Sequence, residues 1–307
     1  MTMLATCAGK TCGRATPGVT GSTVHAVDIL ARERRKERRR SHEACSALRG
    51  ECSVMSTAAA TSPALREPAL RGQTVVVIGG SAGIGLETAR RARAEGAEVI
   101  LTARNEQRLK DAADQMGARI TAAFDASDPA SVERFLMDLP TVIDHVMVTA
   151  GRPHYVSPFE VGLEEARAAF SEHMLQALWV GRAARHKVRP GGTLLFMGGT
   201  GGRRVARGMA IVSAVTAAMP ALIANLALEL APVRVNLLAA GFVDTPLSAQ
   251  LLGDQLDARR EQLRATLPIH RVVESTDVAA LAVHIMINTA LTGATFDVDG
   301  GQQFSGS

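Results

Sequence analysis

Short apolar runs alternate with helical segments from residue 71 to the end of the chain. Strands that read as continuous apolar runs are typical of parallel sheets buried on both faces, and their alternation with helices indicates βαβ units. The seven runs that predict strands are Thr74–Gly79, Glu98–Ala103, Ala118–Phe124, Val142–Ala150, Gly192–Gly198, Val233–Ala239 and Thr295–Asp299. Helical spacing predicts helices that include Glu106–Met116, Pro129–Leu139, Glu160–Lys187 and Met209–Leu230. The pattern therefore predicts an α/β fold, a single Rossmann domain over residues 71–307 with a doubly wound, seven-stranded parallel sheet.

Residues 1–70 lack this pattern and carry the excess of positive charge. The first 54 residues hold 10 Lys and Arg against five acidic residues, whereas the rest of the chain holds 24 against 25. The sequence pI of about 9.2 therefore describes this segment, and we expect the folded domain to bind no nucleic acid. We interpret residues 1–70 as a disordered basic extension. The alternatives are an over-long start, with Met55 as the true first residue, and an arm for a nucleic acid or an acidic partner.

The four cysteines all lie in the same segment, at spacings that fit no common zinc finger, so we expect no metal site. A domain without cysteine suits the reducing cytoplasm, where we expect the protein. We see no secretory signal, and the apolar stretch Ala210–Leu230 is interrupted by Ser213, Thr216, Pro220 and Asn225. This stretch predicts a buried helix, and we expect no association with a membrane.

A glycine motif stands where the first predicted strand ends and a helix begins. Gly79, Gly83 and Gly85 form G-x3-G-x-G in VVVIGGSAGIGLETA. The first glycine allows a tight turn, the second lets the backbone approach a diphosphate, and the third lets the helix pack closely on the strand. The N–H groups at the helix N-terminus favour phosphates, so the motif predicts a dinucleotide site that includes Ser81 and Ile84 of the same turn.

The order of the motifs resembles the short-chain dehydrogenase/reductase family over roughly Arg71–Gly301. The matches are the glycine motif, FDASD at 124–128, TAG at 149–151, RVN at 234–236, GFVDTP at 241–246 and the ending TGATFDVDGG. The resemblance implies an oxidoreductase that acts on a small-molecule substrate with a nicotinamide cofactor. It also implies that Asp125, next to Ala126, meets the adenine amine, that Ala150 and Gly151 line a ribose, and that Thr245 faces the carboxamide.

The end of the second strand bears on the choice of cofactor. NAD-binding domains place an acid there, which holds the ribose hydroxyls and repels a 2′-phosphate. Here Ala103 is followed by Arg104, so the acid is missing and a guanidinium suited to phosphate stands beside the gap. We therefore expect NADP(H) rather than NAD(H), with a merely solvated Arg104 as the alternative.

The residues that usually carry the family's chemistry are absent. The resemblance implies Asn, Ser and Tyr-x3-Lys, and the matching positions hold His173, Gly199, Val212 and Thr216. The chain has one tyrosine, Tyr155, and its four lysines are Lys10, Lys36, Lys110 and Lys187, so neither Tyr-x3-Lys nor Tyr-x6-Lys exists in any register. Loss of a positioned acid–base group typically costs 10²–10⁴ in rate. We therefore do not expect ketone or alcohol chemistry by the family's standard route.

Three interpretations remain. The chain is a reductase with a displaced proton donor, for which His173, His154 and Tyr155 are the candidates, with Thr200 as a further hydroxyl near the lost serine. Alternatively, its substrate is an imine or a quinone-like acceptor that needs less protein acid. The third interpretation is a catalytically silent protein that binds the nucleotide as a sensor or scaffold.

Two further segments carry expectations. The resemblance implies that the apolar helix Met209–Leu230 and the preceding helix pair across the interface of a homodimer or homotetramer. The long excursion Ala240–Val273 between two strands is interpreted as a lid over the substrate, whose leucines form either an amphipathic packing face or an apolar ligand site.

Overall fold

The computed structural model describes residues 67–118, 120–204 and 206–305. Seven parallel strands form one sheet in the order β3-β2-β1-β4-β5-β6-β9. These strands are β1 (Thr74–Ile78), β2 (Glu98–Ala103), β3 (Ile120–Ala123), β4 (Ile143–Val148), β5 (Val188–Gly199), β6 (Arg234–Ala240) and β9 (Thr295–Val298). The predicted fold class and all seven predicted strands are confirmed. The pair β7 (Val243–Asp244) and β8 (Val273–Glu274) was not predicted, because two-residue strands leave no periodicity to read.

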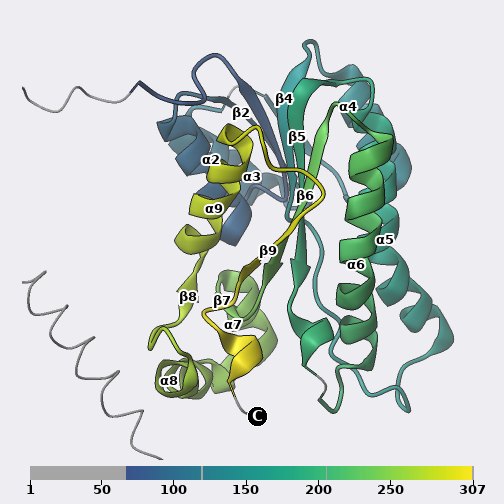
Figure 1. Cartoon of the computed structure of the whole chain (residues 1–307), viewed down its shortest axis with the longest axis vertical. Helices are drawn as coiled ribbons and strands as arrows, with labels where there is room; N and C mark the ends of the chain where they lie inside the picture. The colour runs from purple at the N-terminus through teal and green to yellow at the C-terminus, as the bar shows by residue number, and fades with distance from the viewer. Residues whose placement is uncertain (1–66, 119, 205, 306–307) are drawn as a thin grey trace, which may run out of the picture. The chain divides into compact units, whose positions relative to one another are not determined.

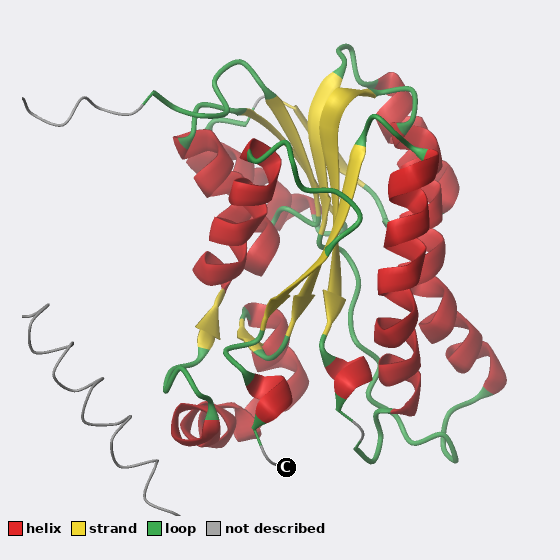
Figure 2. Ribbon diagram, viewed as in Figure 1, coloured by secondary structure: helices red, strands yellow, loops and turns green. Residues whose placement is uncertain are grey.

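Helices cover both faces of the sheet (Figures 1 and 2). One face packs against α2 (Gly83–Ala94), α3 (Glu106–Met116) and α9 (Ser275–Ile287), and the other against α4 (Pro129–Asp138), α5 (Leu163–Ala184) and α6 (Ala210–Glu229). Capping side chains mark the N-termini of α3 and α4. The side chain of Asn105 accepts the N–H of Arg108 at the start of α3, and Asp128 accepts the N–H groups of Ala130 and Ser131 at the start of α4.

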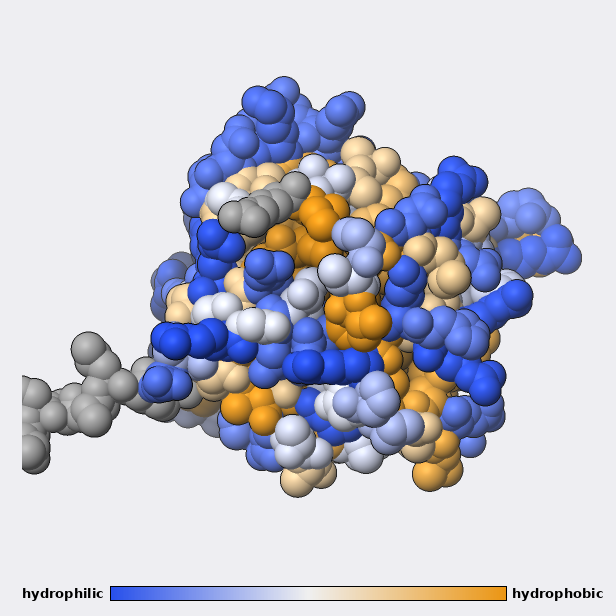
Figure 3. All heavy atoms as spheres, turned by 90° about the horizontal axis from the view of Figure 1, so that it is seen from above, coloured by the Kyte–Doolittle hydropathy of each residue, from blue (hydrophilic) through white to orange (hydrophobic). Residues whose placement is uncertain are grey.

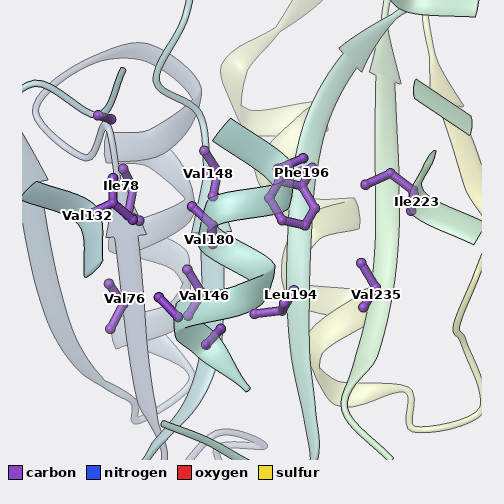
Figure 4. Packing of buried hydrophobic residues seen from close by; sticks show 14 of the residues in the cluster. Val76, Ile78, Val132, Val146, Val148, Val180, Leu194, Phe196, Ile223 and Val235 are labelled. Atoms are coloured by element: carbon purple, nitrogen blue, oxygen red, sulfur yellow. The ribbon is translucent and has the colours of Figure 1, made fainter. Parts of the chain in front are cut away.

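The core fills the space between the sheet and its helices. On the α4–α6 side, alternate residues of the central strands point toward α5 and α6, among them Ile78, Val148, Phe196 and Val235 (Figure 4). The helix α6 is long and apolar enough to cross a membrane, but core helices pass the same test, and six of its residues are buried in this packing. Seen from above, where the strands begin, polar side chains cover most of the domain and apolar ones form smaller patches (Figure 3).

The other end of the sheet, where the strands terminate, carries the connecting segments. There lie η1 (Gly201–Arg203), β7, α7 (Pro246–Leu252), α8 (Leu256–Thr266) and β8, together with the C-terminal segment (Figure 1). The excursion that we interpreted as a lid thus contains two helices at the edge where doubly wound sheets bind their ligands.

The predicted basic extension falls outside the described residues as far as residue 66. Of its last four residues, Leu70 is fully buried and donates its N–H to the carbonyl oxygen of Glu95 at 2.8 Å. Residues 67–70 therefore pack onto the folded domain.

Candidate active site

The glycine turn lies where β1 meets β4, the point at which the strand order reverses. A Cβ on Gly79 would lie 2.6 Å from Thr149 Oγ1 and 2.7 Å from the backbone nitrogen of Ala150, and Gly79 has φ +97°. A Cβ on Gly85 would lie 2.3 Å from the carbonyl oxygen of Gly79, so α2 approaches the strand as closely as it does only because this residue has no side chain. Gly79 and Gly85 thus have the tight turn and the close helix–strand packing that the sequence predicted.

The first turn of α2 has the features of an anion site. Ala82, the N-cap residue, provides no capping side chain, and no acidic residue stands in the first turn. The backbone N–H groups of this first turn therefore have no capping side chain, and they carry the positive end of the helix dipole. Gly83 has φ +52°, and a Cβ there would lie 3.5 Å from Cβ of Thr245. The glycine turn and the segment before α7 thus face each other, and the residues present fit a pyrophosphate. The hydroxyl of Thr245 already caps α7 by accepting the N–H of Ser248.

The ends of β2 and β3 would flank the adenosine. Arg104 is exposed immediately after β2 and forms no ion pair with any residue that the structure describes. Asp125 is exposed after β3, where its carboxylate accepts the N–H and the hydroxyl of Ser127, both at 2.9 Å. Ala126 is buried, and its carbonyl oxygen accepts an N–H of Gln176. A cation and an acid therefore stand on adjacent strand ends, as the sequence predicted.

Two of the positions that the resemblance assigns to the family's catalytic groups, Gly199 and Thr216, lie close together. A Cβ on Gly199 would lie 3.2 Å from the methyl group of Thr216, one turn after Val212 on α6. The hydroxyl of Thr216 donates to the carbonyl oxygen of Val212 at 2.7 Å. Gly199 and Thr216 line a cavity of about 230 Å³. Thr200, proposed from the sequence as a further hydroxyl, is buried directly after Gly199.

Two histidines and a glutamate form a cluster at the end of β4. The segment that follows β4 carries His154, whose Nε2 lies 2.8 Å from Oε2 of Glu172 on α5. Their side chains are 15% and 23% exposed. Next to Glu172, His173 packs against Gly151, where a Cβ would lie 3.2 Å from its Nε2. We call His154, Glu172 and His173 the histidine cluster.

Two properties of the histidine cluster were not expected from the sequence: the lowered pKa of His173 and the presence of Glu172. Burial lowers the pKa of His173, the charge of His154 lowers it further, and the charge of Glu172 opposes both effects. His173 is therefore neutral near neutral pH. The sequence did not single out Glu172, because 18 residues and an irregular loop separate it from His154. The signal in the sequence that could have identified Glu172 is its position next to His173 in the helix that follows β4.

Tyr155 lies on the more open side of the same loop and is 60% exposed. Partial desolvation raises the pKa of its phenol, and the charge of Arg259 on α8 partly offsets this. Arg259 in turn lies within electrostatic range of Arg204, which follows η1. Neither arginine was singled out by the sequence, because the three residues lie on separate segments whose arrangement depends on the fold.

Comparisons with known proteins agree with this geometry. Residues 79–303 match a family model described as Enoyl-(Acyl carrier protein) reductase. The chain is 28% identical over 255 residues to the short-chain dehydrogenase/reductase ATR9 of Stachybotrys chlorohalonatus, covering 76% of this chain and 98% of that protein.

Two similar solved structures hold NADPH. A small-chain dehydrogenase in complex with NADPH is 27% identical, with a TM-score of 0.65 over 76% of this chain and 99% of the other. BdcA in complex with NADPH is 26% identical, with a TM-score of 0.68 over 76% of this chain and 95% of the other. With the strand order, the glycine turn and the family model in agreement, the chain belongs to the short-chain dehydrogenase/reductase family of oxidoreductases.

Proposed function

We propose that this chain is an NADP(H)-dependent oxidoreductase that acts on a carbonyl or imine group of a small molecule, with His154 in place of the family's tyrosine as proton donor. The observation that carries the proposal is the 2.8 Å contact between His154 and Glu172, partly buried at the end of β4. It provides a positioned acid–base group at the edge of the sheet where the usual one is missing.

The choice of NADP(H) rests on charge. Arg104 offers an exposed guanidinium at the end of β2, where no acid stands to repel a 2′-phosphate. The first turn of α2 would hold the pyrophosphate, and Asp125 the adenine. Two relatives of similar fold bind NADPH, which supports the same choice. The cofactor supplies or accepts the hydride.

The proton would come from the imidazole of His154. Glu172 accepts a hydrogen bond from Nε2–H, so Nδ1 is the nitrogen that can exchange a proton with a substrate oxygen or nitrogen. Histidine can carry out this exchange near neutral pH without a lysine partner. His173 is kept neutral by burial, so we assign it to packing beside Gly151.

The test combines binding with turnover in the full chain. NADPH binding is measured by fluorescence and calorimetry, and ketones, imines and quinones are then screened for oxidation of NADPH at ~340 nm, where the reduced nicotinamide absorbs. We expect His154→Gln and Glu172→Gln to lower kcat by about 10²–10⁴ and about tenfold, respectively, with little change in the dissociation constant of NADPH. The matched control is His284→Gln, which changes an exposed histidine on α9.

The outcomes separate the alternatives. Tight binding of NADPH with no turnover of any substrate class would show that the chain is a catalytically silent nucleotide-binding protein and not an enzyme. A loss of kcat in His173→Asn but not in His154→Gln would move the proton donor to His173. If a well-folded protein binds neither NADPH nor NADH, the oxidoreductase proposal is wrong.

A further inference from the structure

The segment that follows β9 is shaped by a buried carboxylate. Asp299 is 4% exposed, and its carboxylate accepts the N–H groups of Gly301 at 2.8 Å and of Gln303 at 3.0 Å. Gly301 has φ +83°, a conformation that glycine adopts without strain. This turn leads into η3 (Gln302–Phe304), which lies near α8 (Figure 1). The turn therefore gives Gln302 a defined position on the lid side of the sheet.

Gln302 joins the segments that follow two neighbouring strands. Its side-chain Oε1 accepts the backbone N–H of Phe242, just after β6, at 2.7 Å. Its backbone carbonyl oxygen accepts an N–H of Arg204, which follows η1 after β5, at 3.0 Å. A Cβ on Gly241 would lie 2.5 Å from the same Oε1, so the glutamine can approach this closely only because residue 241 has no side chain. One residue thus connects the end of β9 with the segments after β5 and β6.

Phe242 lies at the start of the lid. Its side chain packs against an apolar cluster within the lid, which consists of Leu263, Leu267 and Val272. Later in the same segment, Thr245 lies against the glycine turn, because its Cβ is 3.5 Å from the position of a Cβ on Gly83. The hydrogen bond between Phe242 and Gln302 therefore fixes the lid at a point between its apolar cluster and the glycine turn.

The place of this contact indicates which half of the cofactor it affects. The adenosine would lie at the ends of β2 and β3, and the pyrophosphate at the glycine turn after β1. In the strand order β3-β2-β1-β4-β5-β6-β9 the nicotinamide half then extends the opposite way, toward the ends of β4, β5 and β6. Two of these strands, β5 and β6, are those whose following segments Gln302 joins.

We propose that Gln302 is a positioning residue that holds the start of the lid against the nicotinamide half of NADP(H). The inference rests on the proposed function, because it requires the glycine turn to bind this cofactor. Gln302 acts through Phe242 and Thr245, so the loss of its acceptor should loosen the lid beside the nicotinamide half and leave the adenosine half unaffected. One hydrogen bond between neutral groups changes an equilibrium by about two- to tenfold, which sets the size of the effect.

The experiment compares two variants of Gln302 in the full chain. Gln302→Met has a side chain of similar length without the acceptor, whereas Gln302→Glu keeps an oxygen that can accept the N–H of Phe242. We expect Gln302→Met to raise the dissociation constant of NADPH about three- to tenfold. The dissociation constant of the adenosine bisphosphate fragment of NADPH, which lacks the nicotinamide half, should stay within about twofold. Gln302→Glu should bind NADPH as the unaltered chain does.

Hydrogen exchange measures the contact without the cofactor. The amide of Phe242 should exchange about tenfold faster in Gln302→Met than in the unaltered chain, and at nearly the original rate in Gln302→Glu. The matched control is Gln262→Met on α8, which removes a glutamine oxygen that accepts from Arg259 on the same helix and should change neither exchange nor binding. An unchanged exchange rate in Gln302→Met overturns the proposal.

The two ligands separate this inference from the proposed function. An equal loss of affinity for NADPH and for the fragment in Gln302→Met, or no loss for either, overturns the positioning role and leaves the oxidoreductase proposal standing. If the unaltered chain binds neither NADPH nor NADH, the oxidoreductase proposal is wrong and the positioning role is wrong with it. If Gln302→Met does not fold, Gln302→Asn, which draws the acceptor away from Phe242, takes its place in the same measurements.

Discussion

The proposed preference for NADP(H) depends on the charge at the end of β2, where Arg104 stands. Since its guanidinium is exposed and forms no ion pair with a described residue, it can meet a 2′-phosphate without first breaking another contact. We expect Arg104→Ala to raise the dissociation constant of NADPH about tenfold or more and to leave that of NADH nearly unchanged, because only NADPH carries the extra phosphate. Lys110→Ala, an exposed cation on α3, is the control. An equal loss for both cofactors in titration calorimetry would contradict this role.

Residues differ in how far the sequence reveals their role. The roles of Gly79 and Gly85 could be assigned in advance, because a glycine motif between a predicted strand and a predicted helix can be recognised from the local sequence alone. The absence of the usual tyrosine and lysine followed from composition alone. The contact between His154 and Glu172 depends on how an irregular loop folds back on α5, which no periodicity encodes.

At the level of elements, β4 carries a buried histidine whose protonation opposes folding. His145 is 3% exposed, its Nε2 lies 2.7 Å from Gln73 Oε1, and its Nδ1 has no partner among the described residues. Burial lowers its pKa to about 3, and the charges of Arg234 and Arg189 contribute. In the unfolded chain the pKa returns to near 6.5. As pH falls from 6.5 toward 3, the unfolded chain therefore takes up a proton that the folded chain does not.

The protonation of His145 should accordingly leave the free energy of unfolding unchanged above about pH 7. As the pH falls from 6.5 toward 3, the free energy of unfolding should decrease by up to about 1.4 kcal/mol per pH unit. Urea unfolding at several pH values between about 4 and 7.5 measures this slope. His145→Gln should flatten it, and His284→Gln, an exposed histidine on α9, should not. An unchanged slope in His145→Gln would assign the acid sensitivity to other groups.

The elements themselves were predictable to the extent that each one has its own signal. The central strands read as apolar runs because both faces of the sheet are covered, and α3 begins and ends where Asn105 and Gly117 place its caps. The polar connection from β6 to α9 was predicted only as a lid. Its helices α7 and α8 pack through few apolar residues, and Leu263 is the buried one.

For the whole molecule, the apolar face of α5 and α6 carries the expectation of a homodimer or homotetramer. These helices lie side by side on one face of the sheet (Figure 1). Leu175 and Leu178 on α5 are 45% and 42% exposed, and Leu228 on α6 is 79% exposed. A groove of about 520 Å³ runs between the two helices, and no described segment fills it. The groove is lined by five apolar residues and four polar ones: Leu175, Leu178, Trp179, Leu226, Leu230, Arg182, Arg185, His186 and Glu229. Exposed apolar side chains rimmed by polar ones mark an interaction site, and a second copy of the same face would cover it.

We expect light scattering on the full chain to give the mass of a dimer or a larger assembly at micromolar concentration. Leu175→Glu with Leu178→Glu should shift the mass toward the monomer, because it places two charges in an interface that depends on excluding water. The matched control is Met137→Glu on α4, which adds a charge at an exposed apolar side chain outside the groove. Because the glycine turn, α2 and Arg104 all belong to one chain, the monomeric variant should still bind NADPH. A monomer that loses NADPH affinity would show instead that assembly supports the cofactor site.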